Sequence, residues 1–140
     1  MYPNLKILFV CNGNASRGQI AESYYNKFTD SSDATSAVIG PISSRESKIL
    51  PEILQIMNEV KVDISSKEVK LITEEMVIKS DRIVLFCKKE NCPDFLLKHK
   101  SIYLWEVEDL ELEEISTRNF RLIRDKIERL VFSKLLRIEY

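Results

Sequence analysis

The chain has 140 residues, of which 44% are hydrophobic and 31% charged, with a formal net charge of -1. This length and balance predict one domain over residues 1–140 with a sizeable core. The near-neutral charge argues against nucleic acid or an anionic membrane as a partner. No apolar run reaches the length of a membrane span and no signal peptide is recognisable, so we expect a cytoplasmic protein.

Three cysteines and a single histidine limit the kinds of site that the chain can build. In a reducing compartment, three cysteines are not expected to form a structural disulfide framework. No cluster of Cys and His has the spacing of a zinc site, so we expect no bound metal. His99 stands alone and is expected to be a solvated surface residue.

The first predicted element is a buried strand over Ile7–Val10, an apolar run that ends at Cys11. Five small or polar residues separate Cys11 from Arg17, and helical periodicity then predicts a helix from about Gly18 to Phe28. Such a strand–loop–helix unit points backbone N–H groups and the positive end of a helix dipole into one concavity. The concavity suits a tetrahedral oxyanion.

The residue types in this Cys-X5-Arg loop fit oxyanion chemistry. A glycine permits close backbone approach, an asparagine tolerates a left-handed conformation, and an arginine grips two oxygens in a planar, bidentate way. The same donors are expected to lower the pKa of Cys11, which makes it the candidate nucleophile. The alternative is a buried core cysteine beside an ordinary surface arginine. We predict that the oxyanion is bound by Asn12, Gly13, Asn14, Ala15, Ser16 and Arg17.

Further elements alternate between strands and helices along the chain. We expect strands over 34–39, 83–86 and 102–104, helices over about 49–60, 73–78 and 120–135, and an extended segment over 62–66. Pro51 suits a first helical turn and Thr73 an N-cap. The pattern predicts an α/β fold with an open, parallel, four-stranded sheet flanked by helices, in which 83–86 is a central strand.

Three features fall at predicted strand ends: Cys11, Cys87 and the loop after Trp105. Ligands of open parallel sheets bind beyond those ends, so we expect these features on one edge. Taken singly, Cys87 is explained as a buried strand-end residue and Cys92 as an incidental loop residue. Together with Cys11 they suggest sequential thiol exchange. The loop between Cys87 and Cys92 is long enough to close a disulfide if it rearranges.

The loop Cys11–Arg17 resembles the phosphate-binding loop of the low-molecular-weight protein tyrosine phosphatase superfamily, and within it the thioredoxin-coupled arsenate reductases. The resemblance covers nearly the whole chain in order, including Gln19–Glu22, Val62–Ser65, Lys79–Cys87, Cys92–Pro93, Trp105–Asp109 and the final helix.

This resemblance implies a disulfide relay. Cys11 attacks arsenate held by the loop and Arg17, Cys87 attacks the Cys11 sulfur, and arsenite leaves. Cys92 then attacks Cys87, and thioredoxin reduces the Cys87–Cys92 disulfide. Electrons come from thiols, so the resemblance implies no bound cofactor.

The leaving oxygen needs an acid, which the family supplies as an Asp in the loop after the last strand. Asp109 matches best and Glu108 next, although the acidic residues from 106 to 114 also fit a simply solvated loop. Two positions depart from the family. Gly18 replaces a Ser or Thr whose hydroxyl bonds the nucleophilic sulfur, a loss of about 1.5–3 kcal/mol of thiolate stabilisation. Leu110 replaces the Pro that usually follows the acid.

Three functions follow from these residues. The first is arsenate reductase. The second is a phosphatase that forms a phospho-Cys11 intermediate from phosphotyrosine or a smaller phosphate ester. No Tyr or Phe occurs between Trp105 and Phe120, which argues against phosphotyrosine. The third is a non-catalytic anion-binding or redox-sensing protein, an option that Gly18 and Leu110 keep open.

Overall fold

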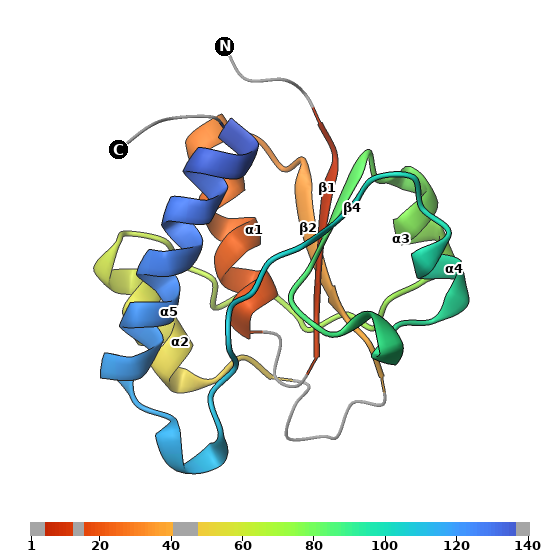
Figure 1. Ribbon diagram of the computed structural model, residues 1–140. Coiled ribbons are helices and arrows are strands. Elements are labelled where there is room, and N and C mark those ends of the chain that lie inside the picture. Colours follow the sequence, from red (N-terminus) through yellow and green to blue (C-terminus); the bar gives the residue numbers. More distant parts are fainter. Residues whose placement is uncertain (1–4, 13–15, 41–47, 137–140) are drawn as a thin grey trace.

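The computed structural model describes residues 5–12, 16–40 and 48–136. Its centre is one sheet of four parallel strands in the order β2-β1-β3-β4 (Figure 1). The strands are β1 (Ile7–Cys11), β2 (Ala34–Val38), β3 (Arg82–Leu85) and β4 (Ile102–Leu104). This confirms the predicted parallel α/β sheet and the central position of the third strand.

Helices cover both faces of the sheet, as Figure 1 shows. One face carries α1 (Ser16–Thr29), α2 (Pro51–Glu59) and α5 (Thr117–Leu130), which continues as a π-helical segment over Val131–Leu136. The other face carries α3 (Glu74–Lys79) and α4 (Asp94–Leu97). Short 3-10 turns lie at Lys89–Asn91 and Leu112–Glu114, inside two segments that were expected to be loops.

The alternation of side chains along each strand divides the core in two. In β1, Ile7, Phe9 and Cys11 pack into the cluster under α1, α2 and α5, whereas Leu8 and Val10 pack into the cluster under α3 and α4. Every residue of β1 is buried, because the strand is central and covered on both faces. We call these two clusters the α1 face and the α3 face.

Helix boundaries follow local signals in most places. Pro51 occupies the first turn of α2, and the Thr73 hydroxyl accepts a hydrogen bond from the Met76 N–H at 3.2 Å, which confirms both predictions. Helix α1 starts at Ser16, two residues before the expected Gly18. Residues 62–64 form no regular element, and the Asp63 carboxylate closes a turn by accepting from the Ser65 N–H at 2.9 Å.

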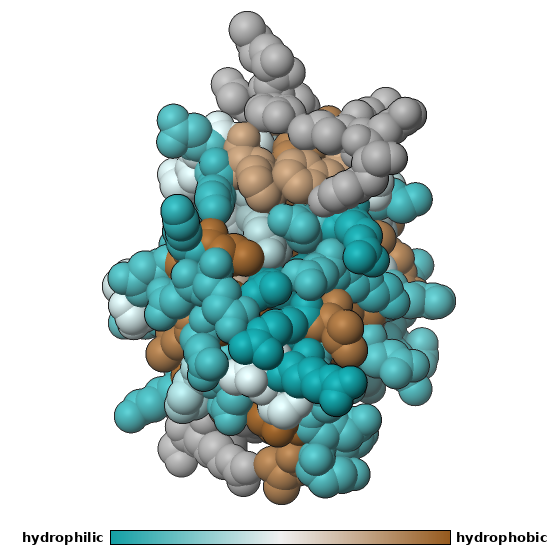
Figure 2. Space-filling model, turned by 90° about the vertical axis from the view of Figure 1, so that its left-hand side faces the viewer, coloured by the Kyte–Doolittle hydropathy of each residue, from teal (hydrophilic) through white to brown (hydrophobic). Residues whose placement is uncertain are grey.

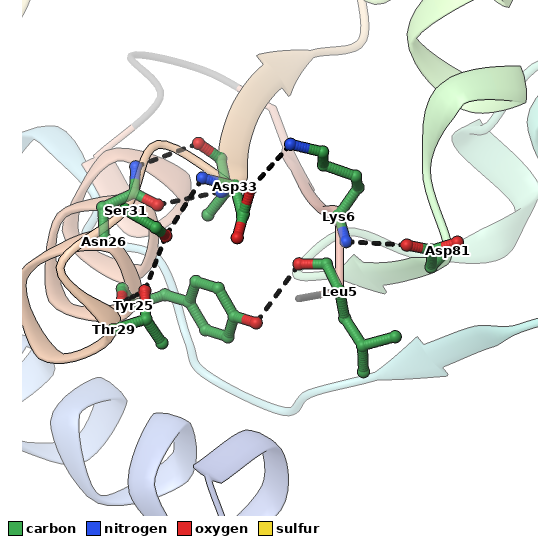
Figure 3. Close-up of polar contacts among 9 residues, drawn as sticks. Leu5, Lys6, Tyr25, Asn26, Thr29, Ser31, Asp33 and Asp81 are labelled. Atoms are coloured by element: carbon green, nitrogen blue, oxygen red, sulfur yellow. Dashed lines mark hydrogen bonds and ion pairs between the residues drawn. The ribbon is translucent and has the colours of Figure 1, made fainter. Parts of the chain in front are cut away.

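The amino ends of the strands are joined by polar contacts (Figure 3). The Lys6 backbone N–H donates to Asp81 at 2.8 Å, and its ammonium group pairs with Asp33 at 2.6 Å. The Asn26 side chain bonds both the N–H and the C=O of Ala34, which ties α1 to the start of β2. These contacts hold the edge opposite the predicted site.

His99 differs from its expected solvated position. Its side chain is half-buried, with Nε2 at 2.7 Å from the Ser80 carbonyl, while Nδ1 accepts from the Ser101 N–H at 3.0 Å. The imidazole therefore fastens the segment before β4 to the segment before β3, which is a structural role.

The outer surface over α2 and α5 is mostly hydrophilic, with small scattered apolar patches (Figure 2). Within the described ranges, no helix combines the length and apolar character that crossing a membrane requires.

Candidate active site

Cys11 is the last residue of β1 and is fully buried on the α1 face. Asn12 follows it, and Ser16 begins α1 with a buried side chain. Gly13, Asn14 and Ala15 lie outside the described residues, so their predicted contacts with an oxyanion stay predictions. As predicted, a strand ends at Cys11 before them and a helix follows them.

Arg17 connects three parts of the carboxyl edge. Its Nη1 donates to the Phe86 carbonyl at 2.6 Å and to the Val107 carbonyl at 2.8 Å, and its Nη2 donates to Asn12 Oδ1 at 2.8 Å. The guanidinium carbon also lies 5.8 Å from the centre of the Phe86 ring. The side chain is nearly fully buried, so the guanidinium is held in place by the ends of β1 and β3 and by the loop after β4.

Three aromatic rings pack together on the α1 face, next to the residues that hold Arg17. The rings of Phe9, Phe86 and Trp105 lie with centroids 5.8–6.2 Å apart on the α1 face. The backbone N–H of Trp105 donates to the Leu85 carbonyl at 2.9 Å, and the backbone N–H of Val107 donates to the Trp105 carbonyl at 3.1 Å. These contacts fix the start of the acidic loop, and with it the Val107 carbonyl that accepts from Arg17.

Asp109 and Glu108 differ in their relation to this arginine. An oxygen of Asp109 lies 3.8 Å from Arg17 Nη2, and its side chain is about one-third exposed. Glu108 is exposed, and among the described ion pairs Arg17 is matched with Asp109 and not with Glu108. Of these two carboxyl groups, Asp109 is therefore the one that lies near Arg17, and Leu110 at the position of the expected Pro does not prevent this placement.

The expected low pKa of Cys11 is wrong. Burial raises the pKa of the Cys11 thiol from 9.0 to about 12, although Arg17 and a hydrogen bond from the Gly18 N–H both act to lower it. The cause is desolvation of the thiolate in a fully buried position, which the sequence pattern does not report. At neutral pH the Cys11 side chain is consequently a protonated thiol.

Gly18 explains how closely α1 packs on the sheet. A Cβ at this position would lie 3.2 Å from Cys11 Sγ and 3.2 Å from the Ser36 Cβ. The Ser36 hydroxyl bonds the buried Glu22 carboxylate at 3.2 Å, and Glu22 pairs with Lys67 at 3.4 Å. Gly18 has no hydroxyl to offer the Cys11 sulfur, but its backbone N–H donates a hydrogen bond to that sulfur. There is little room for a side chain at this position.

Cys87 and Cys92 lie together on the α3 face. Their sulfur atoms are 3.7 Å apart, and Cys92 Sγ is also 3.5 Å from the Lys88 carbonyl. The 3-10 turn Lys89–Asn91 produces this approach, because it folds the four-residue loop back on itself. The rearrangement expected for disulfide closure is therefore small. Cys87 is buried and Cys92 is half-buried.

Cys11 and Cys87 belong to opposite core clusters, at the ends of adjacent strands. A Cys11–Cys87 bond therefore requires Cys87 to turn from the α3 face toward the carboxyl edge. Sequence reasoning missed this separation, although the alternation along β1 and β3 contains the signal. It also missed the carbonyls of Phe86 and Val107 as partners of Arg17, because every residue has a backbone carbonyl and the sequence does not show which of them accepts.

Comparison with known proteins agrees with this geometry. The profile of the family "Low molecular weight phosphotyrosine protein phosphatase" matches residues 6–138. "Arsenate reductase 1" of Bacillus cereus is 30% identical over 123 residues, covering 86% of this chain and 87% of that protein. "Arsenate reductase 2" of Staphylococcus epidermidis is 33% identical over 89 residues, and the match spans 65% of its length, which is less than two thirds.

A solved structure described as "An arsenate reductase in the phosphate binding state" superposes with a TM-score of 0.75 at 22% identity, covering 96% of this chain and 99% of that one. At this identity the likeness shows the fold. The family profile matches almost the whole chain, and the chain therefore belongs to the low molecular weight phosphotyrosine protein phosphatase family.

Proposed function

We propose that this protein is an arsenate reductase of the phosphatase-like fold that uses a three-cysteine relay. The observation that carries the proposal is the 3.7 Å distance between the sulfur atoms of Cys87 and Cys92. Cys87 follows β3, the strand that pairs with β1, and β1 ends at Cys11. A phosphatase needs neither of these thiols, whereas a reductase needs a dithiol that supplies two electrons and becomes a disulfide. The arsenate reductases among the relatives support the same choice.

In the first step the Cys11 sulfur attacks the arsenic of bound arsenate, and a hydroxyl leaves as water. The leaving oxygen takes a proton from Asp109, the carboxyl group that faces Arg17 at 3.8 Å. The proton of the Cys11 thiol passes to the bound oxyanion, because burial keeps that thiol protonated until an acceptor arrives. Arg17 holds the anion with loop donors, which include the backbone N–H groups predicted for Gly13 to Ser16.

In the second step Cys87 attacks the Cys11 sulfur. The electron pair of the S–As bond passes to arsenic, arsenite leaves with the Cys87 proton, and a Cys11–Cys87 disulfide remains. Cys92 then attacks the Cys87 sulfur, and Cys11 is released as a thiol. The resulting Cys87–Cys92 disulfide is reduced by an external dithiol protein of the thioredoxin type.

The second candidate is a phosphatase for small phosphate esters, in which water resolves a phospho-Cys11 intermediate. The family name and the pairing of Arg17 with Asp109 favour it. Phosphotyrosine fits poorly as substrate. The described residues that line the pocket of about 430 Å³ beside Asp109 include acidic, aliphatic, Asn and Lys side chains but no aromatic ring.

Two assays on the same preparation separate the candidates. One measures arsenate-dependent oxidation of thioredoxin, and the other measures hydrolysis of an aryl phosphate. A reductase gives sustained thioredoxin oxidation and, after arsenate without reductant, a Cys87–Cys92 disulfide in peptide mass spectra. Aryl phosphate turnover without that disulfide would replace the reductase proposal with the phosphatase.

A further inference from the structure

The spacing of Cys87 and Cys92 suits a bridging atom as well as a disulfide. A disulfide has sulfur atoms about 2.05 Å apart. Two thiolates on one tetrahedral zinc ion, at about 2.3 Å each, are about 3.8 Å apart. The observed separation is 3.7 Å, so one thiophilic atom can bind both sulfurs with little movement of either.

A groove borders Cys92, one of these two cysteines. It has a volume of about 350 Å³, and Cys92 forms part of its wall together with Ile39, Leu71, Ile72, Pro93 and Phe95. Leu71 is half exposed, so apolar surface beside the thiols faces solvent. The groove thus offers space for a small organic group attached to an atom that the two sulfurs hold.

We propose that Cys87, Cys92 and this groove form a binding site for trivalent arsenicals that carry one organic substituent. Two thiols and an arsenoso group, R–As=O, react to form two As–S bonds and one water molecule. The thiol protons leave with the oxygen, and arsenic stays trivalent throughout. The substituent R lies along Leu71 and Phe95.

Cys11 is not part of this site. It is fully buried on the α1 face, whereas Cys87 and Cys92 share the α3 face. Inorganic arsenite can react with the same two thiols but has no substituent for the groove, so it binds more weakly. An occupied site blocks the relay, a consequence that rests on the proposed reductase function, whereas the binding itself does not.

The test uses the full reduced chain and phenylarsine oxide, without arsenate or reductant. Wild type and Cys11→Ser should each bind one equivalent of phenylarsine oxide and lose two titratable thiols. Their intact mass should rise by the mass of the reagent minus one water. Cys92→Ser retains a single bond and should bind about a hundredfold more weakly, because the second bond is intramolecular. An adduct that survives Cys92→Ser unchanged, or disappears in Cys11→Ser, would overturn the proposal.

The groove has its own test. Leu71→Ala should weaken phenylarsine oxide about fivefold and leave arsenite affinity unchanged, because only the phenyl group contacts that side chain. Leu122→Ala is the matched control, since Leu122 is exposed on α5 away from the dithiol. Equal effects of Leu71→Ala on both arsenicals would reject the groove as the place of the substituent. Normal binding by a chain without arsenate turnover would reject the proposed function alone.

Discussion

The two faces of the sheet hold different kinds of thiol. On the α1 face, Cys11 is fully buried beside an arginine that is bonded to two carbonyls and an amide oxygen. On the α3 face, Cys92 is half-buried in a loop shaped by a 3-10 turn, at 3.7 Å from Cys87. The first environment is rigid and suits anion chemistry. The second is accessible and suits exchange with an external dithiol.

In the proposed relay, the same edge of the sheet combines anion binding with thiol exchange. Cys87 follows β3, the strand next to β1, but it belongs to the α3-face cluster with Cys92. The described hydrogen-bond partners of Arg17 are Asn12, Phe86 and Val107, none of which is a cysteine. The predictions below test whether the two faces act separately.

The largest effect should come from Cys11→Ser, which removes the nucleophile that both candidate reactions share. We expect arsenate turnover and aryl phosphate hydrolysis to fall by at least about 10³-fold. Circular dichroism and thermal unfolding of the variant serve as the control for folding. Near-normal turnover in either assay would remove Cys11 from that reaction.

Substitutions on the α3 face should separate the two reactions. In a relay, Cys87→Ser and Cys92→Ser each abolish multiple turnovers of arsenate, while aryl phosphate hydrolysis persists because water resolves its intermediate. After one turnover, peptide mass spectra of Cys92→Ser should show Cys11 joined to Cys87. Sustained arsenate turnover in Cys92→Ser would contradict the relay.

The acid can be assigned by a matched pair. Asp109→Asn should lower the rate of the first chemical step by about 10²–10⁴-fold, because the leaving oxygen loses its proton donor. Glu108→Gln removes a neighbouring exposed carboxylate and should change the rate little. Single-turnover kinetics with saturating arsenate make the comparison. A larger loss in Glu108→Gln would transfer the role to Glu108.

The buried thiol should make stability fall at alkaline pH. The pKa of Cys11 is about 12 in the folded chain and 9.0 for an ordinary thiol, so above pH 9 the unfolded chain loses a proton that the folded chain keeps. The free energy of unfolding then decreases by about 1.4 kcal/mol per pH unit between pH 9 and 12. Denaturant unfolding of wild type and Cys11→Ser measures this. Equal slopes in the two proteins would show that the pKa is not raised.

The smallest expected effect concerns the packing of α1 against Cys11. Gly18→Ala places a Cβ at 3.2 Å from both Cys11 Sγ and the Ser36 Cβ, and we expect a cost of about 1–3 kcal/mol in unfolding free energy. In a Ser36→Gly background, where one side of the contact is open, Gly18→Ala should cost less. Chemical denaturation of the single and double variants gives both values. An unchanged midpoint for Gly18→Ala would show that the helix shifts freely.

Local patterns predicted the strands and the larger helices because their apolar runs and caps lie within a few residues. Helix α4 escaped prediction, since only the four residues Asp94–Leu97 carry it. The spacing of Cys11 and Arg17 marked the loop, but the pKa of Cys11 depends on burial in the folded core, which the spacing does not encode. His99 was misplaced for a similar reason, because its partners are backbone groups of Ser80 and Ser101.

The contacts of Arg17 also bear on how the chain folds. Its carbonyl acceptors lie 69 and 90 positions further along the chain, after β3 and after β4. These bonds close only when both strands have docked beside β1, so the loop entropy of most of the chain is lost before the guanidinium is bound. The site should therefore assemble late, and a nascent chain that ends before Val107 cannot yet complete it.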